Sequence, residues 1–129
     1  MESSFLFLSS LVVSIILFSI AIFQVLLSLG YPLGEYAMGG YHKILPTKLR
    51  IGSALSALLL LMMGLVFLQH TNVIGWLPFS STTTLVWVMT VFLGINTLTN
   101  LLSRSNKERF VMTPIACVTF FLSLLIALS

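Results

Sequence analysis

The sequence predicts an all-α fold: a polytopic membrane protein made of one four-transmembrane-helix bundle, a single domain over residues 1–129. Three observations lead to this prediction. Only 7% of the residues are charged, against about 25% in soluble domains, so charge cannot cover a water-facing surface. The mean hydropathy is +1.12, and the apolar residues gather in four long runs. Short connections between these runs hold most of the charges.

The four apolar runs are long enough to cross a membrane as helices. A helix needs about 20 apolar residues to span the roughly 30 Å hydrocarbon core. We expect helices at about residues 5–29, 51–69, 83–101 and 106–128. The first run has no basic residue before it and is longer than the apolar part of a usual signal peptide. We therefore interpret it as a retained membrane helix.

The start of the last helix is decided by length and capping. A helix from Pro114 to the end of the sequence would reach only about 24 Å, which is too short to span the core. Ser105 and Glu108 form the S-x-x-E pattern of a capping box, in which both side chains accept from backbone N–H groups of the first turn. We predict Ser105 as the N-cap, Glu108 as the cap carboxylate and Pro114 as a kink inside the helix.

The basic residues predict the orientation in the membrane. All six lie in two connections, which in a four-helix chain fall on the same side: Lys43, Lys48, Arg50, Arg104, Lys107 and Arg109. The two ends of the sequence and the connection 70–82 contain no lysine or arginine. Because short basic loops stay in the cytoplasm, we expect both termini outside and two basic cytoplasmic loops. The expected location is the cell (plasma) membrane, with several membrane passes.

Several function classes find no support in the sequence. The lone Cys117 cannot form an internal disulfide or a C-x-x-C redox pair. There is no metal-ligand spacing, phosphate-binding loop or nucleophile motif, so we expect no metal, no cofactor and no catalytic set of residues. The net charge of +3 is explained by the cytoplasmic loops, and we expect no nucleic-acid partner.

Polar residues inside the predicted helices need partners, because an unsatisfied polar group in hydrocarbon is costly. Gln24 lies in the first helix, and Asn96 and Asn100 lie four residues apart on one face of the third helix. One interpretation makes the asparagines a clamp between helices, and the other makes them part of a binding site. The second helix carries the small-residue pairs Gly52/Ser56 and Ser53/Ala57, whose spacing favours close helix packing.

The connector 30–50 reads GYPLGEYAMGGYHKILPTKLR and holds all three tyrosines and four of the eight glycines. It is either an anchor lying flat in the headgroup layer or a segment that folds back into the bundle. In the second case its Glu35 and His42 meet the amides of the helices at one depth, since irregular backbone at membrane depth lines cavities. The hypothetical ligand-binding set is then Glu35, His42, Gln24, Asn96, Asn100, Tyr31, Tyr36 and Tyr41.

The connector and the stretch NTLTNLLSRSNKERFVMTP together resemble a family of small four-helix bacterial membrane proteins. The shared patterns are G-x-P-x-G…GG-x-H…LP-x-x-R and N-x-x-x-N-x-x-S-x-S-x-x-E. They match, with one more residue before Arg50 than the LP-x-x-R pattern has, at Gly30, Pro32, Gly34, Gly39, Gly40, His42, Leu45, Pro46, Arg50, Asn96, Asn100, Ser103, Ser105 and Glu108. The resemblance covers nearly the whole chain and implies a four-helix membrane protein, but no particular activity.

Three function classes remain open. The first is a non-catalytic binding or accessory subunit that contacts membrane lipids and associates as a homo-oligomer or with a membrane-protein partner. The second is an oligomeric small-molecule transporter, although the first helix lacks the glutamate on which the small multidrug-resistance kind relies. The third is a lipid- or isoprenoid-modifying enzyme with Glu35 and His42 as an acid/base pair, which is a weak signal. We expect the first.

Overall fold

The computed structural model describes residues 3–37, 40–71, 75, 82–103 and 105–129, so Gly39 and Arg104 lie outside the described residues. It confirms the all-α fold with four helices long and apolar enough to span a membrane. These helices are α1 (Ser3–Ser28), α2 (Thr47–His70), α3 (Thr83–Leu101) and α4 (Asn106–Leu128). A short 3₁₀ helix, η1 (Gly34–Tyr36), interrupts the connector between α1 and α2.

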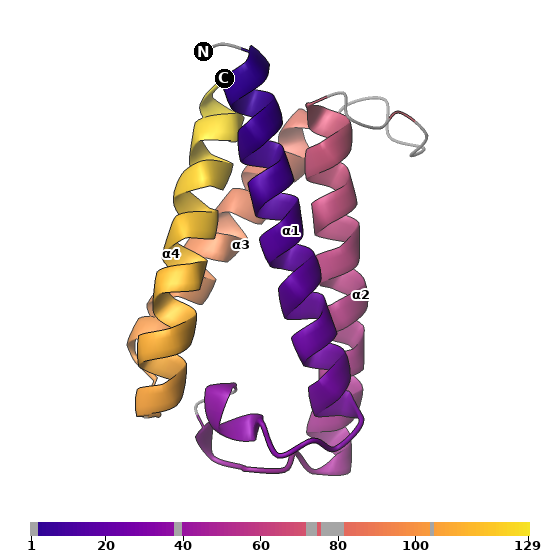
Figure 1. The fold of residues 1–129 in the computed structure, drawn as a ribbon, viewed down its shortest axis with the longest axis vertical. Coiled ribbons are helices and arrows are strands. Elements are labelled where there is room, and N and C mark those ends of the chain that lie inside the picture. Colours follow the sequence, from indigo (N-terminus) through magenta and orange to yellow (C-terminus); the bar gives the residue numbers. More distant parts are fainter. Residues whose placement is uncertain (1–2, 38–39, 72–74, 76–81, 104) are drawn as a thin grey trace.

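The helices form two antiparallel hairpins that diverge toward one end (Figure 1). Helix α1 packs along α2, and α3 packs along α4, whereas the two hairpins touch each other less. Both chain ends lie at one end of the bundle, which we call the terminal end. The connector and the turn between α3 and α4 lie at the opposite end, which we call the connector end.

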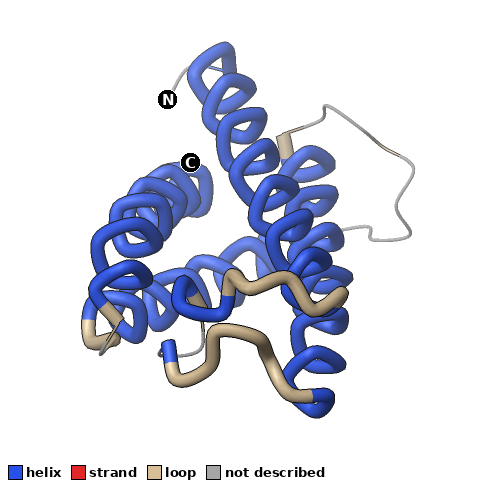
Figure 2. Tube along the Cα trace, turned by 60° about the horizontal axis from the view of Figure 1, so that its bottom comes forward, coloured by secondary structure: helices blue, strands red, loops and turns tan. Residues whose placement is uncertain are grey.

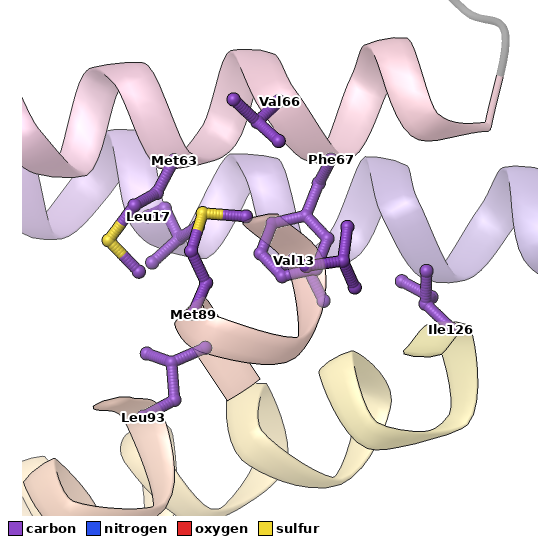
Figure 3. Packing of buried hydrophobic residues seen from close by; sticks show 9 residues of the cluster. Val13, Leu17, Met63, Val66, Phe67, Met89, Leu93 and Ile126 are labelled. Atoms are coloured by element: carbon purple, nitrogen blue, oxygen red, sulfur yellow. The ribbon is translucent and has the colours of Figure 1, made fainter. Parts of the chain in front are cut away.

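A close-packed apolar core joins the hairpins toward the terminal end (Figure 3). Its buried members come from all four helices: Val13, Leu17, Met63, Val66, Phe67, Val86, Met89, Leu93 and Ile126. Two buried hydroxyl bonds accompany it, Ser14 Oγ donating to the Gly64 carbonyl at 3.0 Å and Thr90 Oγ1 lying 2.6 Å from Ser123 Oγ. The hairpins are therefore held together toward the terminal end and separate toward the connector end.

The close contact between α1 and α2 depends on small residues of α2. Ser53 and Ala57 are buried against α1, as expected for one of the two small-residue pairs. Gly52 of the other pair has no neighbour that a Cβ would touch, so it makes no close helix approach. Gly64 instead leaves room for a side chain of α1, since a Cβ there would lie 2.5 Å from the Phe18 ring.

The first residues of α2 and α4 are located by different features of the sequence. Helix α2 begins at Thr47 after the extended Pro46, four residues before the apolar run that starts at Ile51. Backbone hydrogen bonding does not require apolar side chains, so hydropathy alone misses this charged first turn. Helix α4 has Ser105 as its N-cap, with Ser105 Oγ accepting from the Glu108 N–H at 3.3 Å, and Pro114 lies inside the helix.

The connector folds back beneath the bundle instead of running straight from α1 to α2 (Figure 2). Leu27, Ala37 and Leu45 form a second small buried cluster that fixes it to the end of α1. The Gly34 N–H donates to the Lys43 carbonyl at 2.8 Å, so the two arms of the connector pair at this point. Gly34 must lack a side chain, because a Cβ would overlap the His42 carbonyl.

The connector also contacts the start of α4. Ser105 Oγ donates to the Glu35 carbonyl at 2.5 Å, and the Glu35 carboxylate forms an ion pair with Lys107. Gly40 has a φ of +74°, and a Cβ there would overlap the Ser105 side chain. The connector thus bridges the open ends of the two hairpins.

Candidate functional site

A polar cavity of about 590 Å³ lies between the two hairpins at the connector end. All four helices and the connector line it, because the hairpins diverge here and the connector covers the opening. Five of the eight residues in the hypothetical ligand-binding set line this cavity: Gln24, Tyr36, Tyr41, Asn96 and Asn100. We call this space the polar cavity below.

The amide of Gln24 is held at the cavity wall by α2. Ser53 Oγ lies within hydrogen-bond distance of both Gln24 Oε1 and the Gln24 carbonyl, the latter at 2.9 Å. Ser53 is fully buried, so this contact also forms part of the packing between α1 and α2. The partner that a glutamine needs inside a membrane is therefore a hydroxyl from the neighbouring helix, and the amide is fixed in position.

Asn96 and Asn100 bring two further amides to the cavity from α3. Both side chains are half-buried, and within the described part of the chain neither amide hydrogen-bonds to a protein group. A clamp between helices would require such bonds, so the clamp interpretation finds no support in these residues. Two amides with open hydrogen-bonding capacity instead face a space large enough for water or a ligand.

Glu108 is the acidic residue of the cavity. Its side chain is only 6% exposed although it lies in the first turn of α4, whose N–H groups favour a negative charge. The reciprocal half of the predicted capping box is replaced by another contact, since the Ser105 N–H donates to Ser103 Oγ at 3.1 Å. Glu108 therefore lies at the cavity wall, where the sequence suggested only a helix cap.

The connector closes the cavity with aromatic side chains. Tyr36, Ala37 and Tyr41 contribute to the lining, and the Lys107 ammonium lies 5.7 Å from the centre of the Tyr36 ring. The ion pair between Lys107 and Glu35 holds the same segment from outside. Docking of the connector against α4 thus supplies part of the cavity wall.

Glu35, His42 and Tyr31 do not line the polar cavity. Glu35 faces solvent beside Lys107, whose hydrogen bond and charge lower the pKa of the Glu35 carboxyl below its ordinary value of 4.5. Tyr31 is half-exposed and His42 is exposed on the connector. The expected meeting of Glu35 and His42 with the helix amides does not occur, because the connector brings Tyr36 and Tyr41 to the cavity lining and leaves Glu35 and His42 outside it.

Sequence reasoning overlooked some residues that line the cavity. Besides Glu108 these are hydroxyl residues from α2, α3 and the following turn: Ser56, Thr99 and Ser103. In the sequence, Glu108 was singled out only as the carboxylate of the capping box. Its cap position offered a sufficient explanation, so burial had to come from the tertiary structure.

No group of three or more histidine, cysteine, aspartate or glutamate residues that could hold a metal is found among the described residues. His70 lies at the terminal end of the bundle, where its Nδ1 is 2.7 Å from Thr82 Oγ1. His42 lies on the connector at the opposite end, so the two histidines cannot share a site. Comparison with family models, curated proteins and solved structures found no match. The candidate site therefore stands on its own geometry.

Proposed function

We propose that this chain is a non-catalytic binding or accessory protein of the cell membrane, which takes a small ligand into the polar cavity in the cytoplasmic half of the bundle. The observation that carries the proposal is the convergence of three carboxamides and one buried carboxylate on a single cavity: Gln24, Asn96, Asn100 and Glu108. Its volume of about 590 Å³ lies in the usual range of small-molecule sites, roughly 300–1,000 Å³.

The cost of polar groups in a membrane supports a binding role. Asn96 and Asn100 lie in a helix long and apolar enough to cross the bilayer, and the described residues give their amides no protein partner. Leaving an amide without a hydrogen bond costs about 1–3 kcal/mol. Such groups are retained where water or a ligand satisfies them, and in membrane helices they mark ligand pathways.

The orientation in the membrane follows from charge. All six basic residues belong to the connector 30–50 and the stretch 104–109 of the sequence, and the five described ones, which exclude Arg104, lie at the connector end. The positive-inside rule then places the polar cavity and the connector on the cytoplasmic side and both termini outside. In this orientation a cytoplasmic partner protein reaches the connector, and membrane lipids or a second copy of the chain cover the apolar outer faces.

A small-molecule transporter is the second candidate, and the buried carboxylate of Glu108 favours it. An ionisable group at membrane depth is a common element of proton-coupled transport. Proton-driven uptake into liposomes that Glu108→Gln abolishes, with unchanged protein insertion, would support transport over simple binding. No observation favours the lipid-modifying enzyme, because Glu35 and His42 lie outside the cavity.

The binding function is tested by native mass spectrometry and thermal shift on protein extracted in gentle detergent. We expect a recurrent small-molecule adduct, lost in Asn100→Ala and kept in the control Asn106→Ala, whose side chain lies at the exposed start of α4. Without ligand, Asn100→Ala should change the free energy of unfolding by less than about 0.5 kcal/mol, since it breaks no protein hydrogen bond. Retention of the adduct by Asn100→Ala would contradict the proposed site.

A further inference from the structure

An apolar groove of about 500 Å³ runs between α1 and α4 beside the polar cavity. Its lining comes from the facing sides of the two helices, including Ile15, Ile16, Ile115 and Val118. Ser19 is the one hydroxyl residue among the described groove residues, and its Oγ donates to the Ile15 carbonyl at 2.8 Å. The groove therefore offers only hydrocarbon contacts to whatever occupies it.

The groove and the polar cavity share part of their walls. Ile20, Phe23 and Met112 line both spaces, so these side chains form the boundary at which an occupant would pass from one to the other. Isoleucine, phenylalanine and methionine side chains leave no polar group at this boundary, and methionine adapts its shape readily. A polar compartment thus adjoins an apolar one that opens between two membrane helices.

We propose that the ligand is a single-chain amphiphile that enters sideways from the bilayer, with its hydrocarbon chain in the groove and its uncharged hydrogen-bonding head group in the polar cavity. This inference rests on the proposed binding function and names the class of ligand. One groove beside one cavity fits one chain and one head group, whereas a two-chain lipid would leave its second chain outside.

The lining chemistry selects the head group. Carboxamides and hydroxyls both donate and accept, so they suit the hydroxyls of a glycerol or sugar head group. Glu108 is the one acidic or basic side chain among the described residues of the lining. Arg109 is not among the described residues of the lining, and its guanidinium donates to the Ser103 carbonyl at 3.2 Å and to Asn106. A phosphate head group would therefore meet carboxamides and hydroxyls but no basic side chain among the described residues of the lining.

The test is photo-crosslinking of the full chain in phosphatidylcholine nanodiscs with a monoacylglycerol that carries a diazirine on its acyl chain. Because a chain is equally soluble in the bilayer and in the groove, specificity must come from the head group. We expect labelling of the groove segments 15–23 and 112–118 that excess unlabelled monoacylglycerol reduces at least about fivefold. The same diazirine chain on phosphatidylcholine should label the groove no more than the exposed face at Leu58.

Two matched variants locate the occupant. Ile15→Trp fills the groove, and Ile22→Trp is its control, because both isoleucines are 63% exposed on α1 and Ile22 lines neither space. Competable labelling should fall severalfold in Ile15→Trp and in Asn100→Leu and stay unchanged in Ile22→Trp. Since Ile15 is exposed, its replacement should not disturb the core, and circular dichroism verifies the fold.

The outcomes separate this inference from the proposed function. Labelling that no head group competes would mean ordinary bilayer contact, and stronger competition by lysophosphatidic acid would overturn the uncharged head group. If a water-soluble compound gives an Asn100-dependent thermal shift while Ile15→Trp has no effect, the binding function stands and the amphiphile is refuted. If neither the adduct nor competable labelling is found, both proposals fail.

Discussion

Docking of the connector onto α4 depends on Gly40, and Gly40→Ala tests this dependence. The residue has a φ of +74°, a left-handed conformation that costs an L-residue such as alanine about 1–2 kcal/mol. A Cβ would overlap Ser105 Cβ and lie 2.9 Å from Ser105 Oγ, and such overpacking costs about 1–3 kcal/mol. Together the two effects should weaken docking by about 2–5 kcal/mol.

Hydrogen exchange measures this loss directly. We expect docking to protect the Gly34, Tyr36 and Ala37 amides, which donate to carbonyls within the connector. Because 1.4 kcal/mol corresponds to a tenfold change in an equilibrium constant, 2 kcal/mol should raise their exchange rates about 30-fold or until the connector is fully undocked. The expected functional consequence is loss of the ligand adduct, since Tyr36 and Tyr41 close the polar cavity.

Gly52→Ala is the matched control on α2. A Cβ at this position meets nothing within 4 Å, and its helical backbone suits alanine better than glycine by about 0.5–1 kcal/mol. Both substitutions add one methyl group. Gly40→Ala should weaken docking of the connector, whereas Gly52→Ala should slightly stabilise the protein. Exchange of the connector amides within threefold of the unsubstituted protein in Gly40→Ala would refute the reasoning, as would equal effects of both substitutions.

Three further predictions concern single contacts. Because its ion pair with Lys107 lowers the pKa of Glu35 in the folded protein, that contribution to stability is present above pH 4.5 and is lost as the pH falls through the lowered pKa. Connector exchange, expressed relative to the intrinsic rate of an unprotected amide at each pH, should accelerate over this acidic range, and Glu35→Gln should remove the acceleration. Ser105→Ala should destabilise α4 by about 1 kcal/mol through loss of the N-cap, measured by equilibrium unfolding; no change would contradict the capping role. Ser53→Ala should cost about 0.6 kcal/mol by removing the bond to Gln24, and a double-mutant cycle with Gln24→Ala should recover this value as the coupling energy.

Hydropathy and charge in the sequence were sufficient for the membrane fold. The four long apolar runs have few alternatives, because a membrane span must satisfy every backbone group within its own helix. Capping chemistry also predicted the start of α4 at Ser105, because the N-cap bond joins residues within one helical turn. With the start at Ser105, Pro114 lies inside the helix. The apolar run marked only the part of α2 from Ile51 onward, because a helix can continue through charged residues at its start.

The make-up of the candidate site was only partly predictable. Gln24, Asn96 and Asn100 stand out in a sequence because polar residues in membrane helices are rare, and all three line the polar cavity. In the connector, the sequence predicted a single ligand-binding set, and the structure places only some of its residues at the cavity. Glu35 and His42 lie outside the cavity lining, whereas Tyr36 and Tyr41 belong to it.

What only the tertiary structure decided is the direction in which each side chain of the connector and of the first turn of α4 faces. The sequence determined the helices, because hydrophobic length and capping act over one segment at a time. The cavity arises from the divergence of two hairpins and from the backbone contacts that glycine permits at Gly34 and Gly40. Those contacts join residues far apart in the chain, so Glu108 is recognised as part of the cavity lining only once the connector and all four helices are in place.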